Sequence, residues 1–211
     1  MDQAGSLNHV LWLGGSPCSG KSTMADRLSE QFDLHVYHVD EAFGEYVQRI
    51  SSVRHPVTYK WVHTPWQDLW MQPHDVLLEE AIAAYSEQFE LILEDLHALP
   101  DTGPVLAEGT ALLPGMVVTL LSQPNQALWM VPTEAFQREM YPKRGAWVQE
   151  ILATCDDPQA ALENWMDRDV AFARWVADEA AAQDLPCIWV DGSPGISERT
   201  VMVADYFGLR G

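Results

Sequence analysis

Residues 15–22 read GSPCSGKS and lie between an apolar run, 8–13 (NHVLWL), and a segment with helical spacing that begins at Lys21. A loop that wraps around phosphate groups needs inward-pointing backbone N–H groups, and Gly15 and Gly20 permit the dihedral angles and the close approach that this requires. Lys21 can reach the terminal phosphates, the Ser22 hydroxyl can bind Mg²⁺, and the following helix directs its positive end at the anion. The alternative is a glycine-rich turn without a ligand, which the flanking strand and helix oppose. The expected phosphate-binding residues form one run: Gly15, Ser16, Pro17, Cys18, Ser19, Gly20, Lys21, Ser22 and Thr23.

Short apolar runs alternate with helical patterns along the whole chain. This alternation predicts a parallel sheet covered by helices on both faces, within one domain of 211 residues. The expected strands are 8–13, 35–39, 105–107, 127–131 and 187–190, and the expected helices include 21–32, a long one between Pro73 and Pro100, 113–121, and another through 166–180.

The charge of the chain limits its partners. There are 31 acidic and 12 basic residues, a formal net charge of −19, which opposes binding to a nucleic acid polymer or to an anionic membrane surface. The expected partner is therefore a small molecule. Three cysteines without CxxC spacing indicate neither a disulfide framework nor a zinc site, and no apolar run has the length of a membrane span. A cytoplasmic protein is expected.

Beyond GGSPCSGKST, the segments VYHVD, LAEG and VDGSP and a region that contains Arg and Lys follow one another in a familiar order. On these segments the chain resembles the nucleoside- and nucleotide-kinase-like branch of the P-loop superfamily, which includes adenylate, shikimate and gluconate kinases and chloramphenicol phosphotransferase. The resemblance implies a three-layer α/β fold with a five-stranded parallel sheet in the order 2-3-1-4-5. It also implies a substrate-binding segment at about 41–75, a small mobile lid at about 133–157, and ATP with Mg²⁺ as cofactors.

Two carboxylates follow predicted strands. Asp40 matches a position where small-molecule kinases carry an acidic residue, so it would orient or deprotonate the acceptor or help to hold Mg²⁺. The alternative for Asp40 is an N-cap of a helix that begins near Glu41. Glu108 is expected to replace the missing Walker-B aspartate, and the alternative is a solvated loop glutamate. The expected metal-binding residues are Ser22, Asp40 and Glu108.

Basic residues are scarce, and several cluster in the lid-like region and the helix after it. Lid closure would bring Arg138 and Arg144 onto the transferred phosphoryl group as catalytic residues, with Lys21 and Asp40. Solvation at the surface is the alternative for each basic residue there, Lys143 and Arg168 included. Ser193, in the turn 191–194, is expected beside the nucleotide base, unless this segment is only a turn that enters a helix.

The segment 43–70 is rich in aromatic and basic side chains, which suits a planar or a phosphorylated acceptor. Packing between helices is the alternative for its aromatic residues. The candidates are Tyr46, Arg49, Arg54, His55, Tyr59, Lys60, Trp61, His63, Trp66 and Trp70.

These patterns together predict an ATP-dependent small-molecule kinase, a phosphotransferase that acts on a hydroxyl or phosphate of a metabolite, as a monomer or homodimer. A nucleotide-binding regulatory or NTP-hydrolysing module is one alternative, although the chain has no NKxD motif. An ATP-binding subunit that has lost catalysis and binds a partner protein is another. The identity of the acceptor is left open by the sequence.

Overall fold

The computed structural model describes residues 7–100 and 103–210. Five parallel strands form one sheet in the order β2-β3-β1-β4-β5, as the resemblance implies. The residues predicted to bind phosphate follow β1, and the segment that contains Asp40 follows β2, so both lie at the same edge of the sheet. The strands are β1 (Val10–Gly15), β2 (His35–His38), β3 (Val105–Gly109), β4 (Ala127–Pro132) and β5 (Cys187–Val190).

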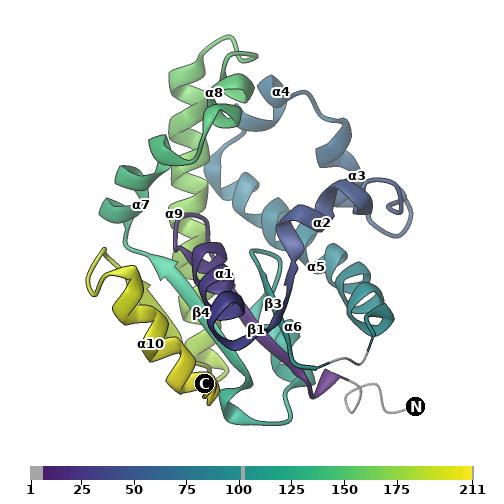
Figure 1. Ribbon diagram of the computed structural model, residues 1–211. Helices are drawn as coiled ribbons and strands as arrows, with labels where there is room; N and C mark the ends of the chain where they lie inside the picture. The colour runs from purple at the N-terminus through teal and green to yellow at the C-terminus, as the bar shows by residue number, and fades with distance from the viewer. Residues whose placement is uncertain (1–6, 101–102, 211) are drawn as a thin grey trace.

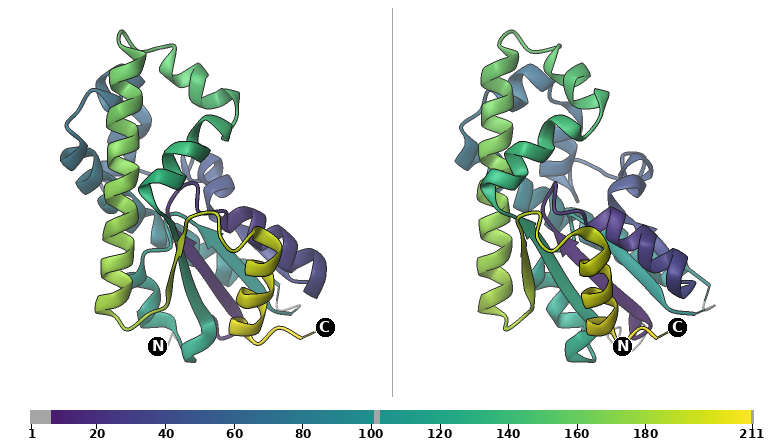
Figure 2. Two further views of the ribbon diagram at one scale, coloured as in Figure 1. Left: turned by 90° about the vertical axis from the view of Figure 1, so that its left-hand side faces the viewer. Right: turned by 60° about the vertical axis from the view of Figure 1, so that its left-hand side comes forward.

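Helices cover both faces of the sheet, as Figure 2 shows with the sheet between α9 on one side and α1 and α10 on the other. Side chains alternate between two apolar cores along β1, because successive residues of a strand point to opposite faces. Trp12 packs with α5, α6 and α9, whereas Leu13 packs with α1 and α10. The layer helices are α1 (Lys21–Phe32), α5 (His74–Ala98), α6 (Pro114–Val117), α9 (Pro158–Ala182) and α10 (Ile196–Phe207).

Two helical insertions extend beyond the carboxyl edge of the sheet (Figure 1). The first connects β2 to α5 and contains α2 (Val39–Tyr46), α3 (Pro56–His63) and α4 (Trp66–Trp70). The second connects β4 to α9 and contains α7 (Glu134–Met140), the 3-10 helix η4 (Tyr141–Lys143) and α8 (Ala146–Leu152). A third apolar cluster joins α4, η4 and α8 to the far end of α9, so the two insertions meet around that helix.

Local signals explain where the helices of the second insertion begin. Thr133 caps α7 by accepting a hydrogen bond from the Phe136 N–H at 3.4 Å. Asp157 caps α9 by accepting from the Ala160 N–H at 3.0 Å, and Pro158 occupies the first helical position. The polar, proline-containing stretch after β4 therefore forms short helices that are stopped and restarted by caps.

Some predicted boundaries are wrong. Val39, expected to end the second strand, begins α2 instead, because its buried side chain faces the core and the acidic residues after it lie near the positive end of the helix. β3 continues through Gly109. The helix expected at 113–121 divides into α6 and a 3-10 helix, η2 (Val118–Leu120), where Thr119 donates its hydroxyl to the Met116 carbonyl. A second short 3-10 helix, η3 (Pro124–Gln126), precedes β4.

Within the described ranges, no helix is both long enough and apolar enough to cross a membrane.

Candidate functional site

The loop between β1 and α1 needs glycine at both of its ends. Gly15 has a φ of 137°, and a Cβ atom there would lie 1.9 Å from the Met130 carbonyl oxygen. Gly20 has a φ of 81° in the left-handed region. The Ser16 N–H donates to the same Met130 carbonyl at 3.2 Å, which anchors the loop to β4. These contacts fix the loop as a tight arch over the start of α1.

The interior of this arch has hydrogen-bonding groups without partners. Ser16 and Ser19 are buried, and among the described residues neither hydroxyl has a hydrogen-bond partner. The N-cap of α1, Gly20, supplies no side-chain hydrogen bond, so the first N–H groups of the helix are also free for a ligand. Unsatisfied hydroxyls beside a positive helix end fit the oxygen atoms of a bound phosphate.

Lys21 and Asp40 face each other across the arch. The Lys21 ammonium is buried and lies 3.8 Å from Asp40 Oδ2. Asp40 accepts hydrogen bonds from the Thr110 N–H at 2.9 Å and from the Thr110 hydroxyl at 3.1 Å. Asp40 lies inside the first turn of α2, whose N-cap is His38, so the N-cap interpretation is wrong. Its carboxylate is instead held by the segment that follows β3.

Glu108 is a buried strand residue, which excludes the interpretation as a solvated loop glutamate. Its carboxylate accepts from the Ser22 hydroxyl at 3.3 Å and lies 2.9 Å from His38 Nδ1. Burial lowers the pKa of His38, but the hydrogen bond and the charge of Glu108 outweigh it, and the net shift of this pKa is upward. An anionic oxygen therefore stands directly beside the Ser22 hydroxyl.

These oxygen donors fit a magnesium ion. Mg²⁺ prefers one or two carboxylates together with phosphate oxygens and water, and it does not need a cage made only of protein ligands. The described part of the chain contains no group of three His, Cys, Asp or Glu side chains arranged to hold a metal. Ser22 and Glu108 would supply the protein's contacts, with Asp40 nearby.

A cavity of about 400 Å³ opens beside the arch, and we call it the loop cavity. Lys143 and Arg144 of the second insertion line it, and Arg199 of α10 lines it as well. Ser193 is not among its lining residues, whereas its neighbour Gly192 is; the Ser193 N–H donates to Asp191. The other lining residues are Cys18, Ser19, Gly20, Thr23, Phe136, Met140, Val190 and Ile196.

Cys18 of the arch is an unreactive thiol. Its φ of 66° is unusual for a residue other than glycine. Burial raises the pKa of Cys18 to about 11, although Arg144 and Lys21 act in the opposite direction. The thiol therefore stays protonated near neutral pH, so Cys18 serves in the wall of the cavity rather than as a nucleophile.

A smaller space of about 180 Å³, the central cavity, lies between the arch and α9. Arg144 lines both the loop cavity and the central cavity. Asp40 and Arg168 also line the central cavity. Three charged side chains from three separate segments thus meet where the arch faces α9.

The cations of the central cavity are held by a buried anion, Asp169. The Arg168 Nε lies 2.6 Å from Asp169 Oδ1, without the geometry of a hydrogen bond. The Tyr141 hydroxyl donates to Asp169 at 2.8 Å and accepts from Arg144 at 3.3 Å. Burial lowers the pKa of Arg168, but Asp169, Tyr85 and Tyr141 together outweigh this effect, so the net shift of the pKa is upward. One carboxylate therefore links the cation of α9 to the cation of the second insertion.

A third space, the tryptophan cavity, has a volume of about 250 Å³ and borders the central cavity. Asp40, Tyr85, Trp165 and Arg168 line both spaces. Its lining residues come from five helices: α2, α3, α4, α5 and α9. Its remaining lining residues are Phe43, Trp61, Trp66, Leu69, Trp70 and Gln88.

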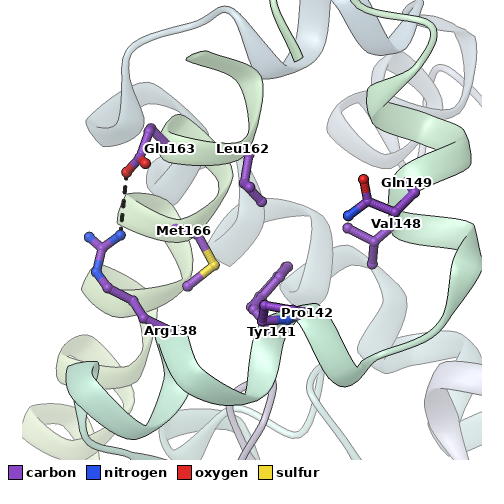
Figure 3. A pocket seen from close by; sticks show the side chains of 8 residues that line it. All are labelled: Arg138, Tyr141, Pro142, Val148, Gln149, Leu162, Glu163 and Met166. Carbon is purple, nitrogen blue, oxygen red and sulfur yellow. Dashed lines mark hydrogen bonds and ion pairs between the residues drawn. The ribbon is translucent and has the colours of Figure 1, made fainter. Parts of the chain in front are cut away.

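Arg138 lies elsewhere. Its guanidinium binds Glu134 at 3.2 Å, Glu163 at 3.4 Å and Asp167 at 2.6 Å. It lines a separate cavity between the second insertion and α9, and Figure 3 shows it turned toward Glu163. Three carboxylates pair with the Arg138 guanidinium, so the structure does not bring Arg138 to the arch as the sequence prediction requires.

The basic residues of the first insertion are also turned away from the cavities. Arg49 pairs with Glu94 and Asp95, Arg54 with Glu90, and Lys60 with Glu80. All four acidic partners belong to α5, so these cations attach the insertion to that helix. In this structure none of these three cations lines the tryptophan cavity, and of the predicted acceptor-binding residues only aromatic ones do.

Apart from apolar and aromatic wall residues such as Tyr85, Trp147 and Trp165, sequence reasoning missed five residues that line the cavities or hold their charged groups. Thr110 had a detectable signal, a hydroxyl directly after the strand that ends in Glu-Gly. The others lie within helices that read as ordinary apolar or surface patterns, and only the tertiary arrangement brings them to the site. The missed residues are Gln88, Thr110, Tyr141, Asp169 and Arg199.

No protein-family model and no curated protein matches this chain. Among solved structures, the chain is similar to deoxyadenosine kinase from M. mycoides with bound dATP, at 12% sequence identity and a TM-score of 0.48. The similarity covers 94% of this chain and 99% of that one. Independently of this similarity, the observed strand order and the glycine-containing loop between β1 and α1 agree with the kinase-like P-loop fold that the sequence predicts.

Proposed function

We propose that this protein is a magnesium- and ATP-dependent kinase that transfers the γ-phosphoryl group to a hydroxyl group of a small molecule. The observation that carries the proposal is the succession of three cavities with shared walls. Arg144 belongs to the loop cavity and the central cavity, and Asp40 belongs to the central cavity and the tryptophan cavity. A nucleotide in the first and an acceptor in the third would meet in the central cavity.

The residues of the central cavity suit phosphoryl transfer. The acceptor oxygen would attack the γ-phosphorus, the bond to the oxygen shared with the β-phosphate would break, and ADP would leave. Asp40 would take the proton of the acceptor hydroxyl, since its carboxylate is held toward the cavity by Thr110. Lys21, Arg144 and Arg168 would neutralise the charge on the transferred group.

The metal-binding proposal rests on Ser22 and Glu108, with Asp40 acting directly or through water. Bound Mg²⁺ neutralises the phosphate oxygens during transfer. The chain's own part is to present the Ser22 hydroxyl and the Glu108 carboxylate at the end of the arch, 3.3 Å from each other.

The second insertion, 133–157, is proposed to act as the lid. It supplies Arg144 to two cavities, and its Tyr141 contacts Asp169 of α9. Closure of this segment would exclude water from the central cavity and bring Arg144 onto the phosphates.

ATP consumption by the purified protein with Mg²⁺ tests the proposal. The acceptor panel contains nucleosides, sugars, sugar acids and aryl alcohols. Acceptor-dependent turnover is expected, and it should be lost in Asp40→Asn and kept in the control Asp205→Asn, which changes an exposed carboxylate of α10. ATP hydrolysis that does not depend on an acceptor would support an NTP-hydrolysing module instead, and binding without consumption would support a partner-binding subunit.

A further inference from the structure

The tryptophan cavity offers flat walls in a nearly common orientation. Trp70 stacks on Trp165 with ring centroids 4.1 Å apart and an interplanar angle of 8°. Trp66 lies at 11° to Trp70 with centroids 6.3 Å apart. Trp61 meets Tyr85 edge to face at 82°. Rings that are held in place by one another lose little freedom when a ligand binds, so this arrangement favours a flat, unsaturated partner.

The polar groups in the wall of the same cavity favour a ligand that carries hydrogen-bond acceptors. Trp70 Nε1 is buried and has no hydrogen-bond partner in the described part of the chain, whereas the buried Arg168 Nε lies 2.6 Å from the Asp169 carboxylate. Both groups can only donate. Gln88, 4% exposed, adds an amide that can donate and accept. Because unsatisfied buried donors are unfavourable, a ligand with acceptor atoms at its edge would be stabilised here.

The charges of the cavity oppose an anionic ligand. The Arg168 guanidinium is already matched by the buried Asp169 carboxylate, and it lies over the rings of Trp61 and Trp70 at 5.9 and 5.2 Å. Asp40 adds a carboxylate to the wall. The basic side chains of the first insertion bind α5 and do not line this cavity, so no surplus cation is present in its wall.

We propose that the acceptor is an uncharged compound with a flat unsaturated ring, hydrogen-bond acceptor atoms at the edge of the ring, and a hydroxyl group on a flexible arm. The ring lies in the tryptophan cavity and the arm extends to Asp40. This inference rests on the proposed kinase function, because Asp40 is the point at which the hydroxyl would react. Nucleosides and nitroaryl diols share this chemistry, whereas sugar acids and nucleoside monophosphates do not.

Calorimetric titration in the presence of Mg²⁺ and a saturating non-hydrolysable ATP analogue, which would fill the loop cavity, measures the acceptor site alone. The probes are adenosine, thymidine and chloramphenicol as ring compounds, with gluconate and AMP as compounds that lack the ring or carry charge. At least one ring compound is expected to bind with a Kd below about 1 mM, the upper end of ordinary Michaelis constants, and more tightly than gluconate or AMP. The ring compound that binds identifies the source of the ring.

Two matched pairs of variants locate the bound ring. Trp66→Leu changes a 42% exposed tryptophan of the cavity, and Trp189→Leu changes a 48% exposed tryptophan of β5 outside it. The first should weaken binding about fivefold, and the second should leave it unchanged. Gln88→Leu should weaken binding about tenfold, and Ser86→Ala, which loses only a hydrogen bond within α5, should not.

Lys21→Ala separates this inference from the kinase proposal. The variant should bind the ring compound as the wild type does while failing to turn it over, since Lys21 lines neither the central nor the tryptophan cavity. Ring binding without turnover in the wild type would defeat the kinase proposal and leave the ring site intact. Preferential binding or phosphorylation of gluconate or AMP, no ring binding at all, or equal affinity in wild type and Trp66→Leu would overturn the ring proposal.

Discussion

In the arch that we propose binds phosphate, one run of the chain, 15–23, supplies nearly every group, whereas the tryptophan cavity takes its walls from α2, α3, α4, α5 and α9. The arch needs its residues in a fixed spacing because a single turn of backbone would surround the anion. The cavity needs only that side chains from distant segments converge. The first region tolerates little change in sequence order, and the second depends on packing and on one buried charge pair.

The largest effect is expected in the arch itself. Lys21→Ala should lower kcat/KM about a thousandfold, because the buried ammonium that would neutralise the transferred charge is lost. Steady-state kinetics with the best acceptor measures this. Lys60→Ala, on the surface of α3, is the control and should behave as the wild type. Similar losses in both variants would mean that the arch has no special role.

Asp169 tests the other region through stability. Asp169→Asn should lower the free energy of unfolding by about 3 kcal/mol, because the buried Arg168 guanidinium loses its matching charge. Asp167→Asn, two residues earlier on α9, breaks only a partly exposed pair with Arg138 and should cost less than about 1 kcal/mol. Urea unfolding curves compare the two, and equal losses would show that Asp169 is not the anchor of this region.

The Mg²⁺ requirement tests the proposed role of Glu108, which lies beside Ser22 of the arch. Glu108→Gln keeps the shape of the side chain but removes its charge beside Ser22, so the Mg²⁺ concentration for half-maximal activity should rise about tenfold. Glu94→Gln on α5 is the matched control. An unchanged Mg²⁺ requirement in Glu108→Gln would remove Glu108 from the metal site.

The smallest effect is expected at the support of Asp40. Thr110→Val removes the side-chain hydrogen bond to the carboxylate but keeps the one from the Thr110 N–H. The remaining bond limits the loss of kcat to about fivefold, and the KM for ATP should not change. If the KM for ATP rose while kcat stayed constant, Thr110 would act in nucleotide binding instead.

The same contrast explains what could be predicted from the sequence. The parallel strands and the loop between β1 and α1 depend on local patterns, and the strand order is what the resemblance to P-loop kinases implies. These predictions are confirmed apart from shifted boundaries such as Val39. The partner of each lid cation depends on contacts between distant segments. Arg138 and Arg144 look equivalent in sequence, yet three carboxylates bind the first, while Tyr141 draws the second toward Asp169. No spacing rule within the chain distinguishes them.

Helix α9 is a long, uninterrupted and rigid element of the fold. Its single proline is at the first position and it contains no glycine, so nothing in its sequence provides a hinge over a length of about 37 Å. One end of α9 packs against β4 and β5, and the other end carries Trp165, Arg168 and Asp169 within little more than one turn. In the insertion that docks on it, Gly145, with a φ of 111°, separates η4 from α8. In the proposed kinase, the wall of the acceptor site would therefore belong to a rigid helix, and the proposed lid would be the short segment between Thr133 and Asp157.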